Sequence, residues 1–250
     1  MVRESQVKVG MTFKTNKCGD ILVLEYTNAH DVFVKFVNTG TELKSSTSAI
    51  LSGGVSDPYA PLMKGVGWCG RKYPTKGKNG TGLSKEYAVW SGMFHRCYGG
   101  HKSSASYEDK KITVAPEFHS YEDFYEFFTK LPNAYEDGWQ LDKDLFFNGT
   151  YSPASVCMLP SEINVAMTFS DSRKTNTAFP GVKKAGNNFY ARHRKNDIEY
   201  SLGSFKTEKE AFDAYSKAKH DWVCELAEKY KEKLPENVFN ALMNWYPNVN

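Results

Sequence analysis

The sequence predicts an α+β chain with a small N-terminal antiparallel β-barrel, a central ββα module with flanking helices, and a C-terminal three-stranded sheet backed by a helix. Three observations favour this class. Short alternating segments begin the chain, a strand-turn-strand pattern precedes a proline-initiated helix in the middle, and three further strand patterns precede a long amphipathic segment. A chain of 250 residues is long for one compact domain. We therefore expect four parts, at 1–55, 56–83, 84–172 and 173–250.

The composition is that of a folded protein. Hydrophobic residues make up 40% of the chain and aromatic residues 14%, which is ample for packed cores. The net charge is only +3, so any preference for a charged partner depends on how the charges are distributed. Five scattered cysteines without a C-x-x-C pair favour reduced thiols over disulfides or a zinc ribbon. With no signal-peptide core and no run of 18 apolar residues, we expect a soluble, cytoplasmic protein that does not enter a membrane.

The N-terminal part alternates like a set of short strands. Strands are expected at 12–14, 20–26, 31–37 and 41–45, separated by the turn clusters "NKCGD", "TNAHD" and "NTG". So many short strands in so few residues favour a small, strongly bent barrel. We interpret it as an accessory module, because a fold of this kind does not by itself identify a ligand.

The segment from Tyr59 to Lys85 is rich in Gly, Pro and aromatic residues and carries only positive charge. Two readings stay open: a solvated linker, or an extended strand along a phosphate backbone, which such a run of cations would favour. In the second reading Lys72 and Lys76 are candidate DNA contacts. The basic residues of the segment are Lys64, Arg71, Lys72, Lys76, Lys78 and Lys85.

Two amphipathic helices are predicted next. The first spans about Ser84 to Tyr98 and the second starts at Ser120, with Asp123 as its capping-box partner. Arg96, in the last turn of the first helix, is free to contact a phosphate or to pair with an acid of the second. The residues expected to face the core are Tyr87, Trp90, Phe94, Cys97, Phe124, Phe127 and Phe128.

A strand-turn-strand-helix unit follows. Asn148-Gly149 is a strong hairpin signal that would join strands at 139–147 and 150–158. Pro160 suits the first turn of the helix. Asp142 on the first strand and Asn164 on the helix would then bring oxygen ligands around one Mg²⁺ or Mn²⁺ ion, which could stabilise the leaving oxygen of a phosphodiester.

An ordered set of motifs, running from 60 to 235, resembles the phage-type HNH homing endonucleases. More narrowly it is similar to the phage-encoded subgroup in which an apetala-type (plant ethylene-response-factor) DNA-binding domain follows the HNH unit. The motifs are Y-x-x-W-x-x-M-x-x-R-C-Y at 87–98, F-x-x-F at 124–127, "LDKD" at 141–144, "YSP" at 151–153 and P-x-x-I-N at 160–164.

The resemblance implies that Asp142 and Asn164 are the metal ligands, with Asp144 as a further ligand or an orienting group. This chain has Lys143 where the family has the histidine that activates water, and Ser155 where the family has an asparagine that pins the loop. A lysine accepts a proton only if its pKa is strongly lowered, which acidic neighbours oppose. His119 and His95 are candidates to replace the base in space, and Arg96 or Lys143 to stabilise the developing charge.

The C-terminal part has seven Lys and Arg and no acid between Arg173 and Lys195. Strands are expected at 181–184, 189–194 and 199–205, followed by a helix with Thr207 and Glu210 as a capping box. The arrangement is similar to the apetala-type domain, in which the sheet enters the major groove. The family's tryptophans are absent from two contact positions, so its base preference does not carry over. The implied DNA contacts are Lys183, Lys184, Asn188, Arg192, Arg194 and Ser201.

Three functions remain open from the sequence. The first is a divalent-metal-dependent endonuclease that nicks double-stranded DNA as a monomer or weak dimer, in the host cytoplasm if phage-encoded. The second is a catalytically inactive DNA-binding protein or regulator derived from such an enzyme. The third is an interaction protein in which the N-terminal barrel carries the function.

Overall fold

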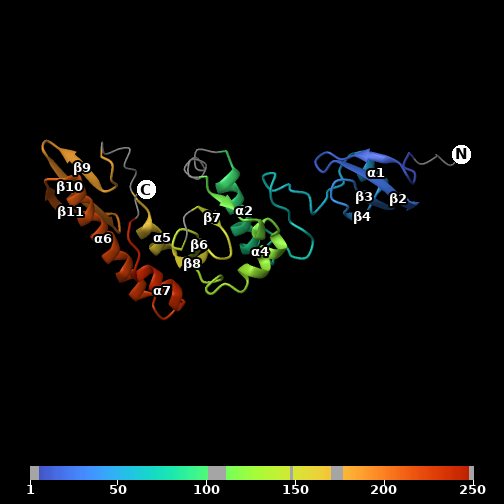
Figure 1. Cartoon of the computed structure of the whole chain (residues 1–250). Helices are drawn as coiled ribbons and strands as arrows, with labels where there is room; N and C mark the ends of the chain where they lie inside the picture. The colour runs from blue at the N-terminus through green and yellow to red at the C-terminus, as the bar shows by residue number, and fades with distance from the viewer. Residues whose placement is uncertain (1–5, 101–110, 147–148, 170–176, 248–250) are drawn as a thin grey trace. The chain divides into compact units, whose positions relative to one another are not determined.

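The computed structural model describes residues 6–100, 111–146, 149–169 and 177–247 (Figure 1). The chain forms two compact units, Met1–Phe127 and Phe128–Asn250. The division falls inside the expected module 84–172. The expected border between residues 172 and 173 and the turn residue Asn148 lie outside the described residues.

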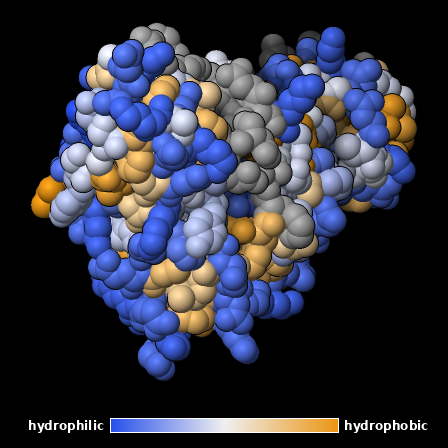
Figure 2. Space-filling model, turned by 60° about the vertical axis from the view of Figure 1, so that its left-hand side comes forward, coloured by the Kyte–Doolittle hydropathy of each residue, from blue (hydrophilic) through white to orange (hydrophobic). Residues whose placement is uncertain are grey.

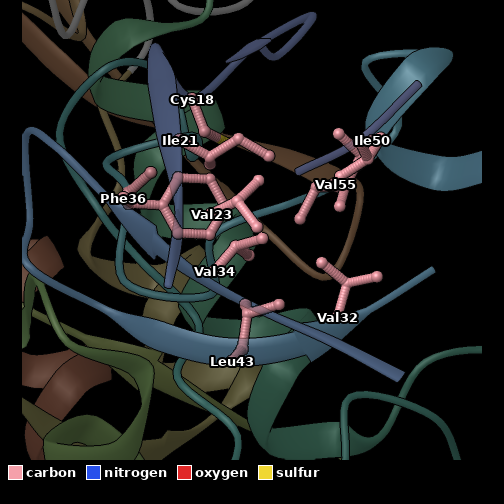
Figure 3. Packing of buried hydrophobic residues seen from close by; sticks show 11 residues of the cluster. Cys18, Ile21, Val23, Val32, Val34, Phe36, Leu43, Ile50 and Val55 are labelled. Atoms are coloured by element: carbon pink, nitrogen blue, oxygen red, sulfur yellow. The ribbon is translucent and has the colours of Figure 1, made fainter. Parts of the chain in front are cut away.

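The N-terminal unit begins with a four-stranded antiparallel meander in the order β1-β2-β3-β4. Alternating apolar residues of β2 and β3 point into one core, which Ile50 of α1 and Val55 complete (Figure 3). The strands expected to form a small, bent barrel do not close into one: β1 pairs only with β2 and β4 only with β3, so the described strands form an open sheet. The elements are β1 (Thr12–Lys14), β2 (Asp20–Asn28), β3 (Asp31–Phe36), β4 (Glu42–Ser45) and α1 (Thr47–Leu51).

The rest of this unit packs two helices around aromatic side chains. α2 (Lys85–Tyr98) begins at Ser84, whose hydroxyl accepts the Tyr87 N–H, and α4 (Tyr121–Phe128) follows the short strand β5 (Thr113–Val114) and the 3₁₀ turn η1 (Pro116–Phe118). Four of the aromatic residues predicted to face the core are fully buried, and Tyr87 and Phe127 are half-buried. The fully buried residues are Trp90, Phe94, Phe124 and Phe128.

The segment expected to be a linker has little regular structure, but it packs on these helices. The Trp68 N–H donates to the His119 carbonyl, and the Tyr73 ring stacks on Tyr125 at 3.9 Å. The segment is therefore part of the folded unit and not a solvated chain.

The C-terminal unit starts with a short antiparallel pair of strands, β6 (Trp139–Asp142) and β8 (Cys157–Pro160), with β7 (Thr150–Tyr151) between them in sequence. α5 (Ser161–Met167) follows β8 directly and packs on both strands of the pair. A strand-strand-helix unit is thus present at the predicted place, although with different pairing.

The predicted hairpin of 139–147 with 150–158 forms only at its far end, where Leu141 pairs with Met158 and Asp142 with Cys157, two residues out of the predicted register. β6 ends at Asp142 because its carboxylate Oδ1 accepts the N–H groups of Asp144 and Leu145, each at 2.9 Å, and turns the chain. β6 then pairs with β8, which places Asp142 opposite Cys157. Pro160, expected as the first helical residue, is the last residue of β8 and the N-cap of α5.

A three-stranded antiparallel sheet in the order β11-β10-β9 ends the unit, with α6 packed against it (Figure 1). The strands and the Thr207–Glu210 capping box confirm the prediction, with small shifts of the ends. A short helix after Pro235, α7, packs on α6. The elements are β9 (Val182–Ala185), β10 (Asn188–Lys195), β11 (Ile198–Phe205), α6 (Glu208–Lys229) and α7 (Glu236–Met243).

Two further findings concern the whole described chain. All five cysteines are free thiols, as their scattered positions predict. None of the described helices is both long enough and apolar enough to cross a membrane.

Candidate functional site

The outer face of the C-terminal sheet, the face turned away from α6, gathers most of the predicted DNA contacts. Ala191 and His193 on β10 are buried toward the helix, so Arg192 and Arg194 point to the other side and are exposed. Lys183 pairs opposite Tyr190 and Ser201 opposite Arg192, which places both on this same face. The outer face is defined here by Lys183, Asn188, Tyr190, Arg192, Arg194 and Ser201.

Lys184 lies on the opposite face. It pairs with Phe189, which packs against the core of the C-terminal sheet, and the Lys184 ammonium lies 5.7 Å from the Phe189 ring centroid. Five of the six predicted contacts on the sheet therefore share the outer face, and Lys184 does not. The period of two was visible in the sequence, but the pairing register was needed to choose between the adjacent lysines.

Acidic residues of the β10–β11 hairpin reduce the positive charge of the outer face. Arg192 pairs with Glu199 at 2.8 Å and Arg194 with Asp197 at 3.7 Å. All four side chains are about half or more exposed, and exposed ion pairs of this kind contribute little, about 0–1 kcal/mol. These acids lie after the acid-free stretch 173–195, and only the hairpin brings them beside the arginines.

One cation of this region was missed by sequence reasoning. The Lys206 ammonium donates to the Asn188 Oδ1 at 3.3 Å, across the end of the sheet. Lys206 follows β11 directly, and the pairing of Phe189 with Phe205 brings it next to the start of β10. Its place could have been found only from the antiparallel pairing of the two strands.

The second candidate region lies around Asp142 in the strand pair β6–β8. One carboxylate oxygen holds the turn described above, and the side chain is half-buried. Burial raises the pKa of Asp142 above its ordinary value, and the Asp144 charge adds to this rise, while the two backbone N–H groups oppose it.

Lys143 does not have the surroundings of a general base. Its side chain is buried, at 3% exposure, and its ammonium pairs with the Asp144 carboxylate at 2.5 Å and lies 5.7 Å from the Tyr151 ring centroid. A carboxylate partner stabilises the protonated ammonium. Lys143 therefore acts as a buried cation that holds Asp144.

Asn164 lies on α5 beside one face of β6. Its Nδ2 donates to the Gln140 Oε1 at 3.5 Å, and Gln140 and Asp142, two residues apart on the strand, project from the same face. The Asn164 Oδ1 is buried and has no hydrogen-bond partner. Such an orphaned oxygen is uncommon and requires an explanation.

These two side chains carry oxygen atoms of the kind that a hydrated Mg²⁺ ion takes as ligands. The orphaned Asn164 oxygen and the Asp142 carboxylate are oxygen ligands of the kind that Mg²⁺ takes in small numbers while it keeps several waters. Among the residues that the structure describes, no group of three or more His, Cys, Asp or Glu side chains is placed to hold a metal ion. Any such site here therefore has few protein ligands.

Ser155 organises the loop between β7 and β8. Its hydroxyl, buried at 2% exposure, accepts the Ser152 N–H at 2.9 Å and donates to the Thr150 carbonyl at 2.6 Å. Ser155 stands where the resemblance expects an asparagine that pins the loop. In this chain the serine holds the loop by hydrogen bonds from its side chain to the backbone.

The remaining candidate residues belong to the N-terminal unit. His119 Nε2 lies 3.0 Å from the Val114 carbonyl, with its ring between Trp68 and Phe94, and Arg96 lies in the last turn of α2. His119 is held by contacts within its own unit, while Asp142 belongs to the other. The two histidines described in the C-terminal unit, His193 and His220, pack on Trp222 and Tyr246 respectively.

The two candidate lysines of the segment 56–83 differ in their partners. Lys72 pairs with Glu126 at 2.5 Å, and this hydrogen bond raises the pKa of Lys72 above its ordinary value. Its backbone N–H donates to Glu122. Lys76 is exposed and its backbone bridges to Leu83. Acids of α4 thus partly neutralise the positive charge of this segment.

No protein-family model, no curated protein and no solved structure matches this chain.

Proposed function

We propose that the protein binds double-stranded DNA through the outer face of its C-terminal sheet. The observation that carries the proposal is the convergence of Lys183, Arg192 and Arg194 on one exposed face, opposite the face covered by α6. Strands of a sheet fit into the DNA major groove, where arginine recognises guanine and any cation can contact phosphate.

The two arginines of the outer face can exchange their carboxylate partners for DNA phosphates. Glu199 and Asp197 hold the two arginines only through exposed ion pairs. DNA phosphates can replace these carboxylates at small cost, because exposed pairs contribute little to stability and each phosphate contact releases counterions. Before DNA binds, the two acids hold the arginine side chains through these ion pairs. Figure 2 shows hydrophilic residues over most of the visible surface, with smaller apolar patches between them.

Binding of the full chain to a labelled duplex, measured by fluorescence anisotropy at several salt concentrations, tests the proposal. We expect the logarithm of the association constant to fall linearly with the logarithm of salt concentration, with a slope of about −3 or steeper for three or more phosphate contacts. Absence of binding at low salt, or binding that salt does not weaken, would contradict it.

A second candidate function is metal-dependent cleavage of the bound DNA, favoured by one specific observation. The buried Asn164 Oδ1 without a partner lies beside the strand face that carries Asp142. Asp142 and Asn164 would hold a Mg²⁺ or Mn²⁺ ion, which supplies electrostatic stabilisation of the leaving oxygen. Asp144, paired with the buried Lys143, would orient the turn next to the ion.

Incubation with supercoiled plasmid and Mg²⁺ tests this second candidate. We expect nicking that EDTA abolishes and that Asp142→Asn reduces by about 100-fold or more, because the variant removes the charge of a metal ligand. Asparagine still offers an oxygen to the Asp144 and Leu145 N–H groups, so the turn is kept.

Asp137→Asn is the matched control, because Asp137 is an exposed carboxylate before the same strand. It is expected to nick at the wild-type rate. Intact plasmid with either metal, from protein that still retains DNA, would reject cleavage and leave the binding proposal standing.

A further inference from the structure

A pocket of about 780 Å³ opens in the C-terminal unit between α5, α6 and the second half of β10. Its size lies within the range of small-molecule sites, about 300–1,000 Å³. It forms because β9 pairs with β10 only as far as Val182 opposite Ala191, while β10 continues to Lys195. The uncovered part of β10, which includes His193, borders the pocket.

His193 is the first unexplained group of this pocket. Its side chain is 5% exposed and neither ring nitrogen has a hydrogen-bond partner. Burial, with the charges of Lys219 and Lys195, lowers the pKa of His193 below its ordinary value, so the ring is neutral at physiological pH and offers one donor and one acceptor. Packing against Tyr215 and Trp222 fixes the ring but satisfies neither nitrogen. A buried donor and acceptor left unpaired are costly.

The second buried polar group of this pocket is the ammonium of Lys219 on α6. It is 5% exposed, and its ammonium donates to the carbonyl oxygens of Ala166 at 2.6 Å and Thr168 at 2.7 Å. An ammonium has three N–H groups, so one remains without a carbonyl; the ammonium lies 5.4 Å from the Trp222 ring centroid, and both residues line the pocket. Burial lowers the pKa of Lys219 to about 8, which leaves it mostly charged at neutral pH.

The acids of the pocket do not neutralise Lys219. Each has a cation of its own, and among the residues that the structure describes no carboxylate forms an ion pair with Lys219, although a buried cation ordinarily has one. The pocket therefore has an excess of positive charge at its buried end. The acid–cation pairs are Glu162 with Lys229, Asp197 with Arg194 and Glu199 with Arg192.

From this arrangement we infer that the pocket binds a phosphate monoester, whose oxygens accept hydrogen bonds from Lys219 and His193 at its buried end. Phosphate oxygens are strong acceptors for charged donors. Apolar side chains such as Val182 and Phe169 line the same pocket and suit the organic part of the ester.

The same phosphate chemistry has two sources, a free nucleotide and the terminal phosphate of a DNA end. The buried end of the pocket favours a terminal phosphate over one inside a duplex, because a monoester can enter a hollow that a continuous backbone cannot follow. The pocket does not rest on the proposed DNA binding, since inorganic phosphate and AMP probe it without a duplex.

Titration of the full chain, labelled with ¹⁵N-histidine, with inorganic phosphate and then AMP tests the inference by NMR. We expect one histidine ring to shift, identified as His193 by its absence in His193→Phe. Lys219→Met is expected to weaken binding by about tenfold or more, since it removes a charged donor. Lys209→Met, which removes an exposed lysine on the same helix, should leave the affinity unchanged.

Lys219→Met leaves two carbonyls without their donor, so a loss of binding in that variant could come from a folding defect. His193→Phe is a second variant in which no such defect is expected. Phenylalanine keeps the ring against Tyr215 and Trp222 and removes both unpaired nitrogens. The variant should therefore be at least as resistant to unfolding as the wild type, yet bind AMP about tenfold more weakly by calorimetry.

A pair of duplexes with 5′-phosphate or 5′-hydroxyl ends separates the sources. Tighter binding of the phosphorylated duplex, lost in Lys219→Met, identifies a DNA end, and equal binding of both, with AMP bound, identifies a free nucleotide. No His193 shift up to about 10 mM phosphate or AMP, together with no preference for the phosphorylated end, overturns the inference. Binding that survives both variants also overturns it. If the protein binds AMP but no duplex, the inference about the pocket stands and the proposed DNA binding is rejected.

Discussion

Replacing Arg192 and Arg194 together by glutamine is expected to weaken duplex binding by about 30-fold or more, because each arginine lost from a base or phosphate contact costs about 1–3 kcal/mol. Both side chains are exposed on the outer face of the C-terminal sheet. The slope of the salt dependence should also become shallower by about 1.8, for two phosphate contacts. Fluorescence anisotropy with the same duplex measures both quantities.

The matched control for this pair removes two lysines of α6. Lys209 and Lys217 are exposed and each pairs with an acid four residues on, as the arginines pair with acids of their hairpin. Lys209→Gln/Lys217→Gln changes the net charge by the same amount, so it corrects for general electrostatic attraction. Equal losses of affinity in the two double variants would show that binding depends on net charge and not on the outer face.

Gly181→Ala is expected to destabilise the C-terminal sheet by about 3 kcal/mol, the sum of a left-handed backbone and an overpacked contact. Gly181 has φ +73°, and a Cβ there would lie 2.2 Å from two ring carbons of Tyr215. Tyr215 is buried in the core of the sheet and cannot move aside. Hydrogen exchange of the β10 amides, followed by mass spectrometry, should become about 100-fold faster.

Gly186→Ala is the control for backbone strain alone. Gly186 has φ +60° in the turn between β9 and β10, and a Cβ there would meet no atom within 4 Å. It should cost about 1 kcal/mol, the penalty for the left-handed conformation. If both variants exchange at the same rate, the contact with Tyr215 does not constrain the residue at position 181.

The C-terminal sheet could be predicted from the sequence because the residues that determine its strands, turn and following helix are close together in the chain. Alternation on β10 separates Arg192 and Arg194 from Ala191 and His193, and the turn between β10 and β11 has Asn196 and Asp197 both at positive φ. The capping box of Thr207 and Glu210 marks the start of α6 within three residues of sequence. Each of these signals acts between near neighbours.

The parts that could not be predicted depend on pairing between distant residues. Asp142 ends β6 through its own carboxylate, so the strand does not continue to the two-residue turn that the sequence offers, and β6 pairs with β8 two residues out of the predicted register. The pairing of β9 with β10 decides which of Lys183 and Lys184 faces outward. In the same way, only the folded chain shows Lys143 paired with Asp144 in a buried position.

The adjacent lysines on β9 provide the most direct test of the claim that the outer face binds DNA. Lys183→Gln and Lys184→Gln remove the same charge one residue apart, from opposite faces of one strand. Salt-dependent anisotropy should show that Lys183→Gln weakens binding about five- to tenfold and reduces the slope by about 0.9, whereas Lys184→Gln changes affinity by less than about twofold. Equal effects, or a larger effect of Lys184→Gln, would contradict DNA binding by the outer face.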